Sequence, residues 1–177
     1  VSCPNVRTGL DIGADPDELA RLLGAVRPLT AKPLIVKLTP NTADVSRVAQ
    51  SAEASGADAV SLINTLRAFA PHPDGSGAPW LGGGTGGLSG PAIHPVAVRA
   101  VNDVRVALPD LPIVGVGGVS TVEDVVELML AGASAVQVGT ATFADPRSVI
   151  RLLDGLETWC ARQGVERVAD LNGAVAG

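Results

Sequence analysis

The stretch at residues 33–64, PLIVKLTPNTADVSRVAQSAEASGADAVSLIN, contains two apolar runs separated by a segment with helical spacing. The runs at residues 33–38 and 57–64 are rich in Val, Ile and Leu, which favours buried strands. Between them, over residues 42–55, apolar residues recur on one face of a helix that Asn41 or Thr42 would cap. A strand, a helix and a second strand in this order are typical of a parallel sheet.

The same alternation continues outward from this unit. It predicts a helix at residues 15–26 with no strand before it, a helix at 91–108, a strand at 112–116, a helix at 121–131 capped by Ser120 or Thr121, a strand at 135–138 and a helix at 146–163. Almost continuously apolar strands indicate a parallel sheet covered on both faces. Four units, one lacking its strand, amount to about half of a (β/α)8 barrel of about 250 residues. We therefore predict an α/β fold, the C-terminal part of a TIM barrel with parallel strands and outer helices.

Composition limits the classes of protein to be considered. The chain has 177 residues, 46% hydrophobic and 18% charged, which is enough for one sizeable core. A net charge of −5 and the absence of any run of basic residues argue against a nucleic-acid partner. The only cysteines, Cys3 and Cys160, cannot by themselves form a disulfide framework or an iron–sulfur site, which fits a reducing, cytoplasmic setting. Because the chain begins with Val1 rather than Met, we expect a fragment that lacks its N-terminal half.

Residues 75–98 form an uncharged segment long enough to cross a bilayer. They contain a GGG run, three prolines and a histidine, which indicate a loop rather than a membrane helix. A loop of this length inside a compact domain is usually functional or disordered. No membrane partner is therefore expected.

Glycines accompany the last two predicted strands. In a parallel barrel the reactive groups sit at the carboxyl ends of the strands. Gly115, Gly117 and Gly118 belong to the first of these strand ends, and Gly139 and Thr140 follow the second. Glycine lets backbone amides approach a phosphate, so we predict a phosphate site here; the alternative is that these glycines only form tight turns.

Polar residues also stand at the ends of the first two predicted strands. Lys37 lies inside an apolar run, where an ammonium is costly unless it meets an anionic or polar ligand. The alternative is a lysine that reaches water at the rim of the barrel. Asn64 and Thr65 offer amide and hydroxyl groups suited to a planar polar ligand, although they could equally cap a loop or helix.

The remaining candidates are cysteines and histidines. Cys3 stands beside Pro4 and Asn5, whose amide could point at whatever the thiol faces, but a lone cysteine is more often a small buried hydrophobe. That second interpretation suits Cys160. His72 and His94 have no acidic partner at ligand or triad spacing, so we interpret both as structural and expect no metal site.

Six motifs recur in a fixed order: SCPN at residues 2–5, VKLTPN at 36–41, LINT at 62–65, GGTGGLSGPAI at 83–93, GVGGV at 115–119 and QVGTA at 137–141. Together they resemble the class 1 dihydroorotate dehydrogenases along nearly the whole chain. LINTL followed by a long glycine-rich stretch is most similar to the class 1B branch. Members of that branch pair with an iron–sulfur subunit that carries FAD, and pass electrons to NAD.

The resemblance implies an FMN cofactor in a partial flavin-binding barrel over residues 1–177, and the oxidation of dihydroorotate to orotate in pyrimidine synthesis. Cys3 matches the base that removes the C5 proton while hydride leaves C6 for the flavin. The other matching positions are Asn5, Asn64 and Thr65 for the substrate, Lys37 and Ile63 for the flavin ring, and Gly90, Gly117, Gly118, Gly139 and Thr140 for the ribityl chain and phosphate. The full-length protein would be a homodimer or a heterotetramer with the electron-transfer subunit.

Two departures from the family pattern accompany these matches. The family's upstream half is absent, and Phe69 and the sequence PHP at residues 71–73 replace a methionine and an acidic residue after INTL. One alternative is the flavin domain of dihydropyrimidine dehydrogenase, which shares SCPN and KLTPN but carries ferredoxin-like cysteine runs. Others are a non-redox phosphate-binding barrel, in which Lys37 forms a Schiff base or binds phosphate, and an inactive remnant.

Overall fold

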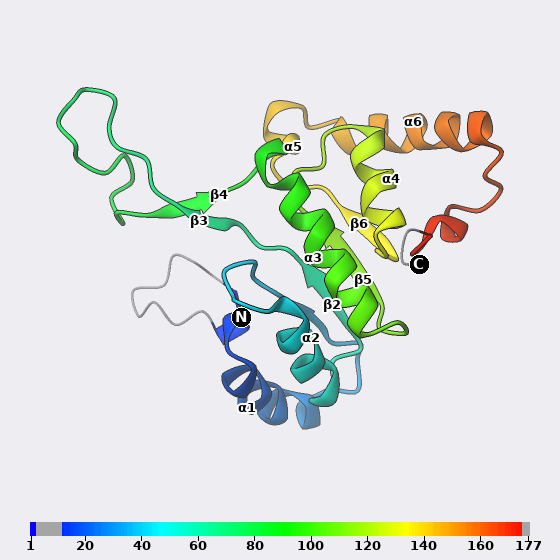
Figure 1. The fold of residues 1–177 in the computed structure, drawn as a ribbon, viewed down its shortest axis with the longest axis horizontal. Helices are drawn as coiled ribbons and strands as arrows, with labels where there is room; N and C mark the ends of the chain where they lie inside the picture. The colour runs from blue at the N-terminus through cyan, green and yellow to red at the C-terminus, as the bar shows by residue number, and fades with distance from the viewer. Residues whose placement is uncertain (3–11, 175–177) are drawn as a thin grey trace.

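The chain is built around a four-stranded sheet in which every neighbouring pair is parallel (Figure 1). The computed structural model describes residues 1–2 and 12–174, so Cys3 and Asn5 lie outside the described residues. The strands β1 (Ile35–Lys37), β2 (Ala59–Leu62), β5 (Ile113–Val116) and β6 (Ala135–Gln137) are arranged in the order β1-β2-β5-β6. All four predicted strands are confirmed, each somewhat shorter than expected.

Helices follow the strands and pack beside one another along one face of this sheet (Figure 1). They are α1 (Pro16–Val26), α2 (Val45–Ala54), α3 (His94–Ala107), α4 (Val122–Leu130), α5 (Ala141–Ala144) and α6 (Ser148–Gln163), with short 3-10 turns at Ile12–Ala14, Arg27–Leu29, Pro91–Ile93 and Val168–Leu171. The α/β class and the architecture of part of a (β/α)8 barrel are confirmed. The short α5 was not predicted from the sequence.

Two helix starts test the capping predictions. Thr121 caps α4, which confirms one of the two predicted caps, and its side chain and that of Asp124 each accept a hydrogen bond from the other's backbone. The prediction of Asn41 or Thr42 for α2 was wrong, because Asp44 Oδ1 accepts from the N–H groups of Ser46 and Arg47 at 3.0 and 3.2 Å. Asp44 directly precedes α2 and satisfies these donors, so Asn41 and Thr42 are not needed as caps.

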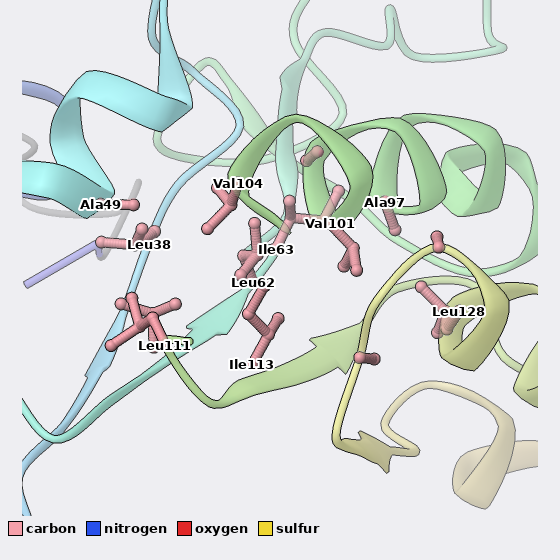
Figure 2. Close-up of a cluster of buried hydrophobic side chains, with 14 of the residues drawn as sticks. Leu38, Ala49, Leu62, Ile63, Ala97, Val101, Val104, Leu111, Ile113 and Leu128 are labelled. Atoms are coloured by element: carbon pink, nitrogen blue, oxygen red, sulfur yellow. The ribbon is translucent and has the colours of Figure 1, made fainter. Parts of the chain in front are cut away.

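The core lies between the sheet and the helices (Figure 2). Leu62 and Ile113 from the strands meet Val101 and Val104 of α3, and all four side chains are fully buried. Gly115 belongs to β5 and faces α4, because an added Cβ would lie 3.3 Å from the Cβ of Leu128 and 3.0 Å from that of Ala133, just after the helix. Its small size therefore serves helix packing, which corrects its assignment to the phosphate-binding glycines.

The expectation that both faces of the sheet are covered was wrong for its two outer strands. In β1, Val36 is buried toward the helices whereas Ile35 and Lys37 are exposed. Ala135 and Gln137 of β6 are likewise exposed. Within the part of the chain that the structure describes, one layer of helices covers one face, so only the central strands β2 and β5 are mostly shielded.

The long Gly/Pro-rich segment contains a β-hairpin, which corrects its interpretation as a loop. The strands β3 (Leu66–Ala68) and β4 (Gly86–Leu88) pair antiparallel, and the hairpin extends away from the body (Figure 1). An isolated bridge between Pro71 and Pro79 extends the pairing, and the rings of His72 and Trp80 stack beside it with centroids 5.2 Å apart. Glycine at positions of close approach disguised these strands in the sequence. None of the described helices is long and apolar enough to span a bilayer.

Candidate active site

A cavity of about 660 Å³ lies at the carboxyl ends of the four parallel strands. Gly115 is not among its lining residues, but it is lined by the other predicted site residues that the structure describes: Lys37, Ile63, Asn64, Thr65, Gly90, Gly117, Gly118, Gly139 and Thr140. A second, more open hollow of about 750 Å³ lies between α2 and α3 and contains none of them. Because the carboxyl ends of the parallel strands all lie at the same end of the sheet, residues distant in the sequence meet in the first cavity.

Lys37 occupies one side of this cavity, at the last position of β1. Its side chain is exposed, and the described residues place no carboxylate within ion-pairing distance. In the described structure this ammonium is therefore not buried. What remains is a positive charge that faces the cavity without a protein counter-charge in the described structure.

Asn64 connects the cavity to the start of the chain. Its side-chain amide donates a hydrogen bond to the carbonyl of Ser2, a residue only 5% exposed that directly precedes Cys3 in the sequence. The carbonyl of Val1 in turn accepts from the N–H of Gly13 at 2.7 Å. The first contact holds Ser2 against a residue that lines the cavity, and the second holds Val1 against the 3-10 turn before α1.

Thr65 is held in place by the motif that follows β1. Asn41 Nδ2 donates to the carbonyl of Thr65 at 3.0 Å, and Asn41 Oδ1 accepts from the N–H of Arg67 at 2.8 Å. Gly87 of β4 lies against the same threonine, since an added Cβ would be 2.1 Å from Thr65 Oγ1. Sequence reasoning treated Asn41 as a helix cap and missed this role, although its place in the VKLTPN motif was a usable signal.

The glycines that line the cavity fall into two kinds. Gly90, Gly117 and Gly118 have φ angles of 85°, 139° and 70°, which disfavour other residues whatever ligand is present. Gly118 also has no room for a Cβ, which would lie 2.8 Å from His94 N and 2.9 Å from the carbonyl oxygen of Gly90. Gly139 differs, because an added Cβ would meet no atom within 4 Å. Backbone conformation therefore explains why Gly90, Gly117 and Gly118 are glycines. At Gly139 the described structure leaves open space beside the backbone.

His94 has acidic partners, which corrects the sequence interpretation. Its Nε2 lies 3.1 Å from Glu127 Oε2 and 3.7 Å from Asp124 Oδ1, and its Nδ1 lies 2.9 Å from the carbonyl oxygen of Gly117. Packing of α3 against α4 brings these groups together across about thirty residues of sequence, where no short motif could reveal them. His72 also pairs with a carboxylate, that of Asp74 at 3.1 Å, on the exposed hairpin.

The Asp124 carboxylate beside His94 is stabilised in its charged form. Partial burial raises the pKa of Asp124. Hydrogen bonds with the backbone N–H groups of Ser120 and Thr121, together with their hydroxyls, lower the pKa by more than burial raises it, so the pKa lies below the usual range. The backbone bonds both measure 2.8 Å. Asp124 thereby ties the loop after β5 to the start of α4.

Several polar residues of the cavity were not predicted as site residues from the sequence. They are Ser89, Ser120, Thr121, Asp145, Ser148 and Arg151. Arg151 pairs with Asp145 at 3.1 Å beside the turn that follows β6. Ser148 Oγ is buried without a hydrogen-bond partner in the described structure. In the same part of the chain, no group of three or more His, Cys, Asp or Glu side chains could hold a metal ion.

Comparison with known proteins decides the family. The family model described as "Dihydroorotate dehydrogenase" matches residues 1–159. This chain belongs to the dihydroorotate dehydrogenase family. The residues that line the cavity therefore occupy the part of the chain that the family model covers.

Curated members of the dihydroorotate dehydrogenase family resemble this chain along its whole length. A protein of Geotalea daltonii is 48% identical over 99% of this chain, and one of Pelobacter propionicus is 49% identical over the same share. A protein of Bacteroides fragilis is 44% identical, and all three are named dihydroorotate dehydrogenase B (NAD(+)), catalytic subunit. The chain spans about 57% of the length of each of these relatives.

Proposed function

We propose that this chain forms part of the catalytic subunit of a class 1B dihydroorotate dehydrogenase and that FMN binds in the cavity. The observation that carries the proposal is that Lys37 and the pair Gly139 and Thr140 line one cavity although they come from opposite edges of the sheet. The family match and the names of the relatives support it over a non-redox phosphate-binding barrel.

The dimensions of the cavity fit this cofactor. Three strand-to-strand spacings separate β1 from β6, and at about 4.8 Å each they amount to about 14 Å. FMN carries its planar ring and its phosphate at opposite ends of a five-carbon chain, so an elongated cavity with different chemistry at its two ends suits it. The volume of about 660 Å³ is ordinary for a site that takes a ligand of this size.

At the β1 end, Lys37 and Ile63 would hold the ring. The Lys37 ammonium faces the cavity and would stabilise negative charge that develops on a ligand there. Ile63 is 1% exposed and sits within the fully packed core, so it offers a rigid apolar contact. One end of the cavity thus combines a positive charge with an apolar surface.

At the β6 end, backbone groups would hold the phosphate and ribityl chain. Gly117 and Gly118 follow β5, Gly139 and Thr140 follow β6, and Gly90 precedes the turn that leads into α3. Backbone N–H groups at such turns attract anions without needing a charged side chain. The open space at Gly139 would leave room for the phosphate.

The substrate would lie over the ring near Asn64 and Thr65. These two residues, together with Asn5, would hydrogen-bond the pyrimidine and its carboxylate. When bound, FMN supplies an acceptor for the hydride that leaves C6 of dihydroorotate. Cys3 would remove the proton from C5 as a thiolate, and because a free thiol has a pKa of about 8.5, the rate should rise with pH unless the site lowers that pKa.

The position of Ser2 supports a role for Cys3 near this site. Asn64 lines the cavity, and its side-chain amide donates to the carbonyl of Ser2, the residue before Cys3 in the sequence.

Electrons would leave through a second subunit. The relatives are named as NAD(+)-dependent catalytic subunits, and we extend to this chain a partner that carries an iron–sulfur centre and FAD. The complete protein would be a homodimer or a heterotetramer in the cytoplasm. NAD reduction should then need the partner, while reduction of the bound flavin by substrate should not.

The test uses the full-length protein that contains this chain. Purified from its natural reading frame, it should be yellow and should lose its visible flavin absorbance when mixed with dihydroorotate without oxygen. Dihydrouracil, which lacks the carboxylate, should leave the colour unchanged. A colourless protein that takes up no FMN, or one that dihydrouracil bleaches equally well, would contradict the assignment.

A further inference from the structure

His94 holds the peptide between Gly117 and Gly118 from the side that faces away from the cavity. His94 Nδ1 lies 2.9 Å from the carbonyl oxygen of Gly117, and because a carbonyl can only accept, Nδ1 carries the proton and donates. His94 is 6% exposed and does not line the cavity, whereas Gly117 and Gly118 do. The histidine therefore lies on the protein side of this peptide.

The geometry of the peptide sets where its other polar group points. In a trans peptide the C=O and the following N–H point in opposite directions, so the N–H of Gly118 is directed away from His94. Among residues 1–2 and 12–174, no backbone or side-chain acceptor forms a hydrogen bond with this N–H. A donor without a protein partner at the wall of a cavity is available to a ligand.

The ring of His94 is fixed on its far side as well. Its Nε2 faces the carboxylates of Glu127 and Asp124 on α4, at 3.1 and 3.7 Å. Asp124 also accepts from the backbone of Ser120 and Thr121, so the same carboxylate anchors the loop that continues from Gly118. The ring thus links α3, α4 and the turn after β5.

We propose that His94 is a positioning residue that directs the Gly118 N–H at the phosphate of FMN. The inference rests on the proposed function, because it requires that FMN binds in the cavity. Donation to the Gly117 carbonyl polarises the peptide and strengthens its N–H as a donor to an anion. His94 acts through this peptide and does not itself touch the ligand.

Comparison of FMN with riboflavin, which lacks the phosphate, isolates this effect in the full-length protein freed of flavin. In the wild type, FMN should bind more tightly than riboflavin. His94→Leu and His94→Gln, which lack a donor at the Nδ1 position, should lower the FMN-to-riboflavin affinity ratio about tenfold, as expected for one bond to a charged group. His94→Asn places an amide N–H at that position and should keep the ratio within about twofold of the wild type.

The outcomes separate the inference from the proposed function. His72→Leu removes the other histidine, on the exposed hairpin, and should leave the ratio unchanged. If the wild type binds neither flavin, the proposed function fails. If the wild type prefers FMN and the Gln variant keeps that preference, or if the variants weaken FMN and riboflavin by equal factors, the positioning role of His94 is wrong. Should the Leu variant fail to fold, the Asn and Gln pair still decides.

Discussion

Lys37 and Thr140 come from opposite edges of the sheet, one at the end of β1 and the other just after β6, and both line the same cavity. Parallel strands produce this result, because their carboxyl ends all lie at the same end of the sheet. A ligand that contacts both residues must extend across four strands. FMN has the length and the two chemically different ends that this arrangement requires.

Gly139 offers the cleanest test of phosphate binding. An alanine there would meet no protein atom within 4 Å, so the fold should tolerate it, but the methyl group would enter the space assigned to the phosphate. We expect Gly139→Ala to weaken FMN binding about tenfold or more, measured by titration of the full-length apoprotein, with an unchanged unfolding midpoint. Gly24→Ala, in the exposed part of α1, is the matched control and should leave FMN affinity alone while stabilising the helix by about 0.5–1 kcal/mol.

Gly118→Ala should fail for a different reason. Its φ of 70° and the 2.8 Å approach of an added Cβ to His94 N make alanine unfavourable whether or not FMN is present. We expect this substitution to lower the free energy of unfolding of the apoprotein by about 2–4 kcal/mol in urea titrations. An apoprotein as stable as the wild type would show that the turn can rearrange, and would remove backbone strain as the explanation for this glycine.

Lys37 should matter for the reaction and not for folding. Its side chain is exposed and forms no ion pair within the described structure, so Lys37→Gln should change the free energy of unfolding by less than about 0.5 kcal/mol. Loss of a positive charge beside the ring should slow flavin reduction by dihydroorotate about a hundredfold in stopped-flow measurements. Lys32→Gln, an exposed lysine before the same strand, should reduce flavin at the wild-type rate. Equal rates in both variants would exclude Lys37 from the ring site.

Asp124 should make the stability of the fold depend on acid. Because its pKa is lower in the folded chain than in the unfolded one, its contribution is complete above the unfolded pKa and is lost as the pH falls through the folded pKa. Asp124→Ala should therefore destabilise by about 1 kcal/mol near pH 7, and the difference from wild type should shrink below about pH 4 in urea titrations. Glu123→Ala, in the same first turn, should show no such pH-dependent difference.

Much of the fold follows from the sequence because its signals are local. Apolar runs and helical periodicity found all four parallel strands and the long helices, and Thr121 marked the start of α4. The hairpin at β3 and β4 escaped detection because its pairing uses glycine and is exposed, so it lacks the apolar alternation of an ordinary strand. The open face of β1 was missed because apolar residues such as Ile35 do not reveal what covers them.

The candidate site was predictable to the extent that strand ends can be recognised. Lys37 ends a strand, whereas Asn64, Thr65 and the glycine pairs follow strands, and the structure brings them all to one cavity. The contacts that organise the cavity from behind were not predictable, because His94 meets Glu127 only through the packing of two helices. The sequence also could not show which glycines are required by backbone conformation or packing and which leave open space for a ligand.

Cys3 is the most direct test of the central claim. In the full-length protein, Cys3→Ala should keep its yellow colour and bind FMN normally, but mixing with dihydroorotate without oxygen should no longer bleach the flavin. Cys160→Ala, which changes the other, buried cysteine on α6, should bleach at the wild-type rate. Bleaching of the Cys3→Ala protein at the wild-type rate would contradict the account.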